Sequence, residues 1–156
     1  MKFKKLFEDW DLKELKIKAG WLEASFKANT ADKQAAWEMY VEMLTRVVTQ
    51  PLPDGDGDEK TALASVYQLF PLTREILKRN TFDCENFALV AVVVLNQIVR
   101  PFTAKWHRLS IAGELDKAAG KMQFRKDLAA LQPKLLSYTR ILGVIADVED
   151  LTKVTD

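Results

Sequence analysis

A polar stripe that could act on a phosphate lies between residues 96 and 107. Its members are Asn96, Arg100, Thr103 and His107. On one continuous helix these four side chains lie within about 60° of one another, because each residue turns the helix by about 100°. A guanidinium can hold a phosphate through two hydrogen bonds, and an imidazole transfers protons near neutral pH. His107 is the only histidine of the chain, so acid–base chemistry near neutrality is expected here first.

Three neighbouring residues complete the candidate binding site. Lys105 and Arg108 can hold phosphates, and Trp106 belongs to an apolar stripe roughly 100° away on the same helix. The polar stripe therefore lies beside the core, where polar groups are costly unless they have partners.

The stripe has three explanations. In the first it is structural: His107 donates to a backbone carbonyl, while Arg100 caps carbonyls freed by Pro101 or pairs with Glu75 or Glu85. In the second it is a non-catalytic binding surface. In the third, His107 moves a proton and Arg100 stabilises the charge of the phosphorane, so that RNA is cleaved without a metal.

The arrangement Arg100-x6-His107 in an all-α chain resembles the Arg-x4–6-His motif of HEPN-type ribonucleases. The resemblance covers these eight residues. It implies a small helical bundle with the motif in its later part. It also implies that Arg100 and His107 are catalytic and that two protomers together form one composite cleft.

Charge is balanced overall but uneven along the chain. The 156 residues carry 23 Lys+Arg and 22 Asp+Glu, a net charge of +1. Residues 100–140 hold nine basic and three acidic residues, a net +6, whereas the remainder holds 14 basic and 19 acidic residues, a net −5. The basic segment could contact phosphates, or it could dock on an acidic segment of its own chain or of a second copy.

Several kinds of site are not expected. A single cysteine, Cys84, excludes a disulfide within the chain and any multi-cysteine metal site, and its acidic neighbours raise the pKa of a thiol. The loop at 51–58 is rich in aspartate, but an EF-hand starting at Asp54 would need glycine at Glu59 and glutamate at Ser65. We therefore expect no metal and no cofactor.

Helical periodicity runs through the whole chain. Apolar stripes predict helices over about 11–28, from about 32 to Pro51, over 63–70 and 72–78, over 83–99, from Pro101 to about 110, and a long last helix. The first stripe consists of Leu12, Leu15, Ala19, Leu22 and Phe26; the second includes Ala36, Trp37, Tyr40 and Val41; the last consists of Phe124, Leu128, Leu131, Leu135, Tyr138 and Leu142. Pro101 either kinks the helix before it or starts a new one.

These patterns predict an all-α, single-domain bundle (1–156) of five to seven helices around a central apolar helix at about 83–99. The apolar stretch at 87–95 is too short to cross a bilayer, so we expect a cytoplasmic protein with no membrane contact. The favoured function is a non-enzymatic interaction module that assembles with itself or another protein. Such modules are common in bacterial multi-component systems, including defence systems. The alternative is the metal-independent ribonuclease, with RNA as the partner.

Overall fold

The computed structural model describes residues 28–154, and every regular element in that range is helical. The elements are α3 (Thr30–Leu44), α4 (Glu59–Tyr67), α5 (Leu69–Asn80), the 3-10 turn η1 (Phe82–Cys84), α6 (Glu85–Val94), the π-helical segment η2 (Leu95–Val99), α7 (Arg100–Ile111), the 3-10 turn η3 (Glu114–Asp116), α8 (Ala118–Ala146) and the 3-10 turn η4 (Leu151–Lys153). The all-α prediction is confirmed for these residues. The helix predicted over residues 11–28 lies outside them.

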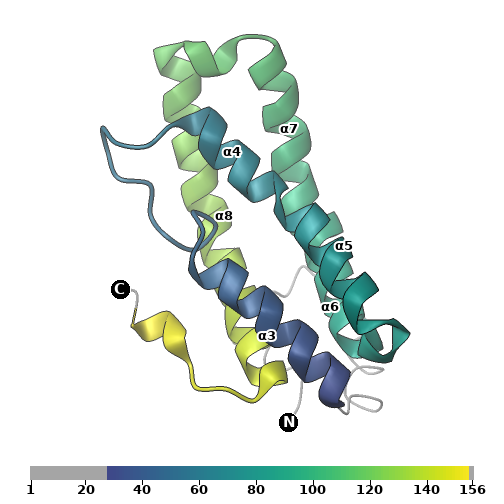
Figure 1. Cartoon of the computed structure of the whole chain (residues 1–156). Helices are drawn as coiled ribbons and strands as arrows, with labels where there is room; N and C mark the ends of the chain where they lie inside the picture. Colours follow the sequence, from purple (N-terminus) through teal and green to yellow (C-terminus); the bar gives the residue numbers. More distant parts are fainter. Residues whose placement is uncertain (1–27, 155–156) are drawn as a thin grey trace.

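Within the described range these elements join into four longer helical rods (Figure 1). One rod is α3 and another is α8. The third consists of α4 and α5, which follow one another across Gln68, whose backbone stays in the helical region. The fourth consists of η1, α6, η2 and α7. Residues 28–154 thus hold four helices and not five to seven. The prediction counted the segments around Pro71 and Pro101 separately, and one predicted helix lies outside these residues. Pro71 lies in the first turn of α5, where an N–H has no acceptor within the helix, so its ring is tolerated there.

A wide π turn carries the helix past Pro101. The N–H of Arg100 donates to the carbonyl of Leu95, five residues earlier, as π-helical geometry requires. Proline lacks an N–H and its ring crowds the preceding turn, and a local change of helical pitch relieves both problems. Helix therefore continues on both sides of Pro101, and the continuous helix assumed for the polar stripe is present.

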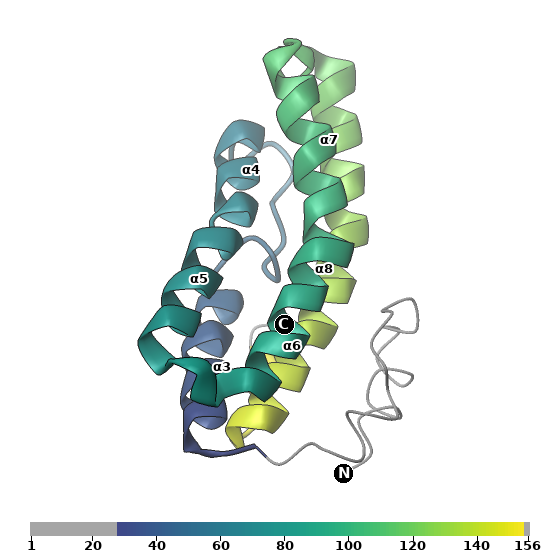
Figure 2. The same cartoon turned by 90° about the vertical axis from the view of Figure 1, so that its right-hand side faces the viewer.

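The four rods run alternately up and down, so neighbours in sequence are antiparallel (Figure 1). α8 packs along α3, which also contacts α5 and α6, and α7 contacts both α4 and α8. In the second view, α6–α7 and α8 lie side by side along most of their length (Figure 2). The predicted apolar stripe of the last helix is buried in full, from Phe124 to Leu142, and forms one side of the core.

The buried face of α3 overlaps the predicted face only in part. Tyr40 and Ala36 are buried as expected, but Trp37 and Val41 are each 40% exposed. Close packing against α8 explains the rotation. A Cβ at Gly143 would lie 3.1 Å from the Tyr40 ring, so this ring rests directly on the backbone of α8.

The helix predicted to be central keeps one side exposed. Phe87, Val90, Ala91 and Val94 are buried, as are Leu95 and Val99 of the following π turn. Val92 is 42% exposed on the opposite face. The prediction that this helix is sheathed on all sides is therefore wrong among the described residues. The other three rods described do not reach the side of α6 that carries Val92.

The helical run from Phe82 to Ile111 is long and apolar enough to cross a membrane, judged by length and composition alone. In its most apolar window, 44% of the residues are buried inside the protein. A helix in the core of a protein can also be long and apolar on most faces. Its composition is therefore weak evidence that it spans a membrane. The expectation of no membrane contact stays a prediction.

A fully buried carboxylate, Asp32, ties the start of α3 to the start of α6. Its oxygens accept hydrogen bonds from the backbone N–H of Asn29 (3.3 Å), the backbone N–H of Phe87 (2.9 Å) and the side-chain amide of Asn86 (2.9 Å). The Asn29 side chain in turn accepts from the Asp32 N–H and donates to the carbonyl of Asp83 (2.7 Å). One cluster thus caps two helices and fixes the corner at which η1 lies.

Candidate functional site

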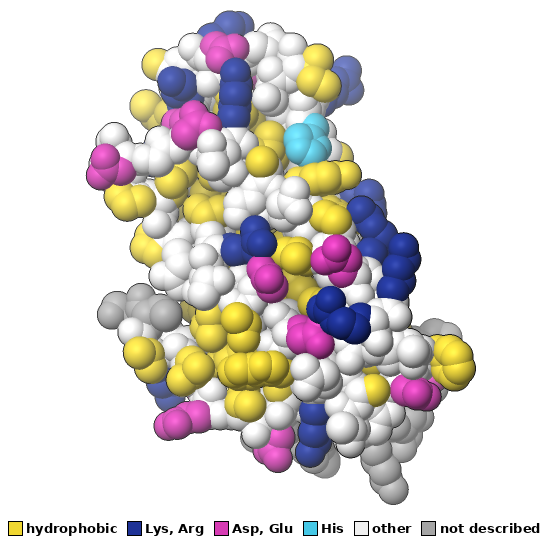
Figure 3. All heavy atoms as spheres, in the orientation of Figure 1, with side chains coloured by type: hydrophobic (Ala, Val, Ile, Leu, Met, Phe, Trp, Pro, Cys, Tyr) yellow, Lys and Arg dark blue, Asp and Glu magenta, His cyan; other side chains and the backbone are white. Residues whose placement is uncertain are grey.

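Two members of the polar stripe, Arg100 and His107, contact aromatic rings from the α4–α5 junction. The Arg100 guanidinium lies 4.7 Å from the centre of the Phe70 ring, and its Nε donates to Oδ1 of Asn96 (3.2 Å). The His107 ring meets Tyr67 edge to face, with the ring centres 5.1 Å apart. Tyr67 and Phe70 contact each other at 5.7 Å. The histidine is visible on the surface in Figure 3, with Lys and Arg side chains gathered along the adjacent edge over α5.

Thr103 lies between them but faces inward. It is buried, and its hydroxyl donates to the backbone carbonyls of Val99 (3.4 Å) and Arg100 (3.2 Å). Because its hydroxyl is not exposed, the structure gives no support to the prediction that Thr103 binds a ligand. Arg100 and His107 are seven residues apart, about 10 Å along the helix, and each engages a different ring.

The structural explanation of the stripe is met only in part. Among residues 28–154, Arg100 forms an ion pair with neither Glu75 nor Glu85. It is exposed, whereas His107 is half-buried. A positive side chain over the face of an aromatic ring is stabilised by the ring's quadrupole, so Phe70 provides a partner that the sequence did not suggest.

Lys105 and Trp106 point to α8 instead, where both meet Asp127. Its Oδ2 accepts from Nζ of Lys105 (2.6 Å) and from Nε1 of the buried Trp106 (3.0 Å), and its Oδ1 accepts from Gln123 (2.8 Å). Partial burial acts to raise the pKa of Asp127, but the hydrogen bonds from Lys105, Gln123 and Trp106 outweigh it and hold that pKa below its ordinary value. Of the five residues predicted to bind, Lys105 and Trp106 thus make a structural contact, whereas Arg108 is exposed and its side chain forms no hydrogen bond or ion pair among residues 28–154.

The acidic loop before α4 has a capping role. Asp58 accepts hydrogen bonds from the N–H and the hydroxyl of Thr61, both at 2.8 Å, and these hold the pKa of Asp58 below its ordinary value. Arg125 from α8 donates to the carbonyls of Pro53 and Asp56, which fastens the loop to the fold. Residues 28–154 contain no group of three or more side chains placed to hold a metal ion.

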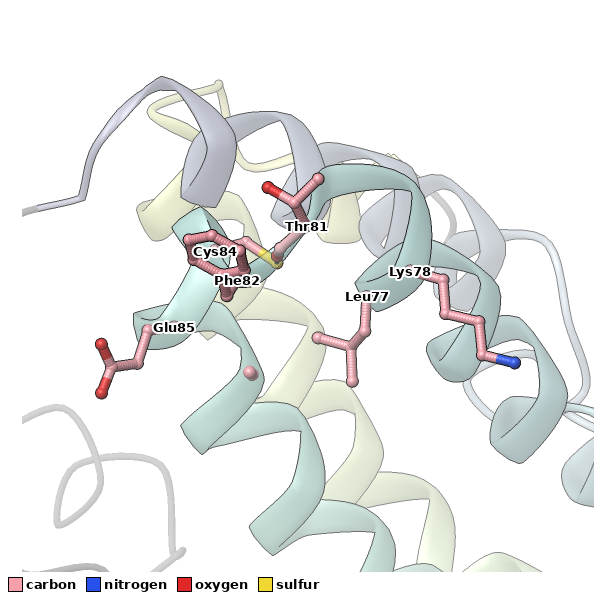
Figure 4. A pocket seen from close by; sticks show the side chains of 7 residues that line it. Leu77, Lys78, Thr81, Phe82, Cys84 and Glu85 are labelled. Carbon is pink, nitrogen blue, oxygen red and sulfur yellow. The ribbon is translucent and has the colours of Figure 1, made fainter.

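The sequence did not point to a groove at the corner between α5 and α6, which we call the Phe82 groove. It has a volume of about 550 Å³ and its walls are mostly apolar. The lining residues are Leu77, Lys78, Thr81, Phe82, Cys84, Glu85 and Ala88. Leu77 projects between the two helices, while Phe82 and Cys84 lie at the corner (Figure 4). Phe82 is 91% exposed, the highest value among the large hydrophobic residues described.

Cys84 is the buried residue of this groove. Its thiol donates to the carbonyl of Thr81 (3.1 Å). Burial raises the pKa of Cys84, and the negative charges of Asp32 and Asp83 raise it further. This direction agrees with the expected effect of acidic neighbours, and a raised pKa disfavours the thiolate form of Cys84.

A second exposed apolar surface, which we call the α3 patch, covers the outer side of α3. It consists of Trp37 and Val41 from α3 and of Val148 and Leu151 from the segment after α8, each between 37% and 40% exposed. Figure 3 shows hydrophobic side chains gathered over this part of the molecule. The α3 patch is flatter than the Phe82 groove, with a hollow of only about 60 Å³ at its edge.

Comparison with protein-family models, with curated proteins and with solved structures finds no match for this chain. The resemblance to HEPN-type ribonucleases therefore stays a prediction.

Proposed function

We propose that this chain is a non-enzymatic interaction module that assembles with itself or another protein through helical surfaces, within a cytosolic bacterial complex such as those of defence systems. In this proposal the four rods act as one bundle that presents the Phe82 groove. The observation that carries the proposal is that groove, in which a 91% exposed phenylalanine borders an apolar hollow of about 550 Å³.

Two physical arguments support a binding role for this corner. A large aromatic ring gains free energy when it leaves water, and aromatic residues are enriched where proteins bind each other. Concave apolar surfaces give a partner side chain more contact than a flat face does. The uncovered side of α6, with Val92, adds apolar area beside the groove.

Light scattering of the purified chain, together with a pull-down from the source cells, tests the proposal. We expect a stable oligomer or a co-purifying protein, and either one should be lost in a Phe82→Ser variant. Ile111→Ser is the matched control, because Ile111 is 90% exposed but lies at the far end of the molecule, at the end of α7. A monomer that captures no partner would contradict the proposal.

A metal-independent ribonuclease remains the second candidate because Arg100 and His107 lie on the same side of an unbroken helix, above Tyr67 and Phe70. Such an enzyme would use Arg100 to hold the phosphate and His107 to transfer a proton. Their separation along the helix favours a cleft completed by a second protomer.

RNA cleavage in the presence of EDTA tests this candidate. The wild-type chain should cleave, and His107→Ala and Arg100→Ala should each abolish cleavage. Lys126→Ala, which removes an exposed charge elsewhere on the basic segment, should cleave normally. If the wild type leaves RNA intact, or if the His107 variant is equally active, the catalytic role fails.

A further inference from the structure

The Phe82 groove has a projecting side chain and a hollow on the same surface. Phe82 extends into solvent at the corner, and the space beside it between α5 and α6 is lined by Leu77 and Ala88. A surface that carries both a projection and a recess can pair with an identical surface turned by 180°. Two-fold pairing of this kind is the commonest arrangement of protein oligomers.

The corner that carries Phe82 is held rigidly. Thr81 has φ +59°, a left-handed value that is unfavourable for a β-branched residue, and such strain persists only where the surroundings enforce it. Three contacts hold the backbone in this conformation. The Asn29 side chain donates to the carbonyl of Asp83, and Asp32 caps α6. The Cys84 thiol donates to the carbonyl of Thr81. The backbone that carries Phe82 is therefore already ordered before any partner binds, which lowers the entropic cost of association.

Charges at the rim of the groove are arranged for self-pairing. Lys78 and Glu85 point away from the groove on opposite sides (Figure 4). Both side chains are exposed, and neither forms an ion pair within residues 28–154. Rotation by 180° about an axis through the groove brings the positive side of one copy opposite the negative side of the other. This pairing is favourable twice, once at each end of the interface.

We propose that the occupant of the Phe82 groove is a second copy of this chain. The Phe82 ring of each copy fills the groove of the other, and Lys78 faces the partner's Glu85. The proposal rests on the proposed interaction function and specifies its partner. It assigns the groove to self-assembly and leaves the α3 patch free for another contact.

Sedimentation analysis over a concentration series tests the dimer. The wild-type chain should show a monomer–dimer equilibrium, and Phe82→Ala should raise the dissociation constant by about tenfold or more, as loss of a buried aromatic anchor does. Ile111→Ala and Val41→Ala, which remove exposed apolar side chains elsewhere, should leave it unchanged. All three positions are exposed, so the variants should stay folded, and circular dichroism verifies this.

A charge-reversal experiment tests the two-fold geometry itself. Lys78→Glu and Glu85→Lys should each weaken self-association, because each places two like-charged pairs at the rim. An equimolar mixture of the two variants should associate again, since both pairs of the mixed dimer are then opposite in charge. The double variant Lys78→Glu/Glu85→Lys should associate with itself in the same way. Arg108→Glu, a reversal far from the groove, is the matched control and should have no effect.

Three results would overturn this proposal. The first is a wild-type monomer at every concentration. The second is a dimer insensitive to Phe82→Ala. The third is a monomer in which cross-links join Lys78 to lysines among residues 1–27 of the same chain, because the groove would then be filled from within. A monomer that still captures another protein in a Phe82-dependent manner would end the dimer proposal but leave the interaction function standing.

Discussion

Replacing Asp32 tests how strongly one buried carboxylate holds the corner between α3 and α6. The perturbation is a pair of variants, Asp32→Ala and Asp32→Asn. In the wild type, the carboxylate accepts hydrogen bonds from two backbone N–H groups and from the amide of Asn86. Alanine removes all three, and the fully buried N–H of Phe87 then has no acceptor.

The magnitude follows from those three contacts. An unsatisfied buried N–H costs about 1–3 kcal/mol, and a lost hydrogen bond to a charged acceptor costs about 1.5–3 kcal/mol where water cannot replace it. The N–H of Asn29 lies near the surface and can bind water, so only a fraction of its contribution is lost. We expect Asp32→Ala to lower the free energy of unfolding by about 3–5 kcal/mol, the sum of two such contributions and a fraction of the third.

Asparagine should have a smaller effect. Its carbonyl oxygen can still accept from the N–H of Phe87. Its NH₂ group replaces the oxygen that accepts from Asn86 and Asn29, so the Asn86 amide must turn over and the N–H of Asn29 must bind water. We expect a loss of about 1–2 kcal/mol, the range of one weakened charge-assisted hydrogen bond.

Urea unfolding monitored by circular dichroism measures both variants. Asp54→Ala, in the exposed loop before α4, is the control and should change stability by less than about 0.5 kcal/mol. The reasoning is refuted if Asp32→Ala costs less than about 1 kcal/mol, or if asparagine and alanine are equally destabilising. Either result would mean that the cap of α6 does not depend on this carboxylate.

Three further predictions concern stability. The hydroxyl of Tyr138 is buried with no hydrogen-bond partner in the described structure. In urea titrations, Tyr138→Phe should therefore leave the free energy of unfolding unchanged or raise it by up to about 1 kcal/mol. Tyr40→Phe, which removes two hydrogen bonds, should lower it. A Cβ at Gly120 would overlap the backbone carbonyl of Glu114, so Gly120→Ala should lower the melting temperature by several degrees. The pKa of Asp127 is lower in the folded than in the unfolded chain, so its stabilising contribution is complete above about pH 5 and is lost as the pH falls through the folded pKa; Asp127→Asn should therefore flatten the acid side of the stability profile.

Much of the fold could be predicted because apolar spacing reports directly on burial. The stripe of α8 from Phe124 to Leu142 has regular helical steps, and it is buried as predicted. On α3 the apolar stripe is wide, and periodicity does not tell which edge of a wide stripe meets a neighbour. That choice depends on Gly143, more than 100 residues away, which lets the Tyr40 ring approach the backbone of α8.

The candidate site was predicted less completely for a related reason. The helical spacing of Arg100 and His107 is a local property, and both lie on the side predicted for them. Their contacts with Phe70 and Tyr67, and the contact of Lys105 with Asp127, join segments at least 20 residues apart, which spacing does not reveal. The exposure of Phe82 depends on the positive φ of Thr81. Positive φ is usual for glycine and rare for threonine, so the sequence did not predict it.

The π turn before Pro101 marks a place where this rod could lose one residue without a change in how its two halves pack. A π turn holds one more residue than an α turn, and here it is closed by the hydrogen bond from the N–H of Arg100 to the carbonyl of Leu95. Deleting one residue within the turn would restore ordinary pitch and leave both flanking helices facing their present neighbours, at the cost of the clash between Pro101 and a regular turn. The same deletion within α7 would instead rotate everything after it by about 100°, carrying His107 off its aromatic support. A one-residue deletion should therefore preserve the packing of this rod within the π turn and disrupt it within the flanking α-helices.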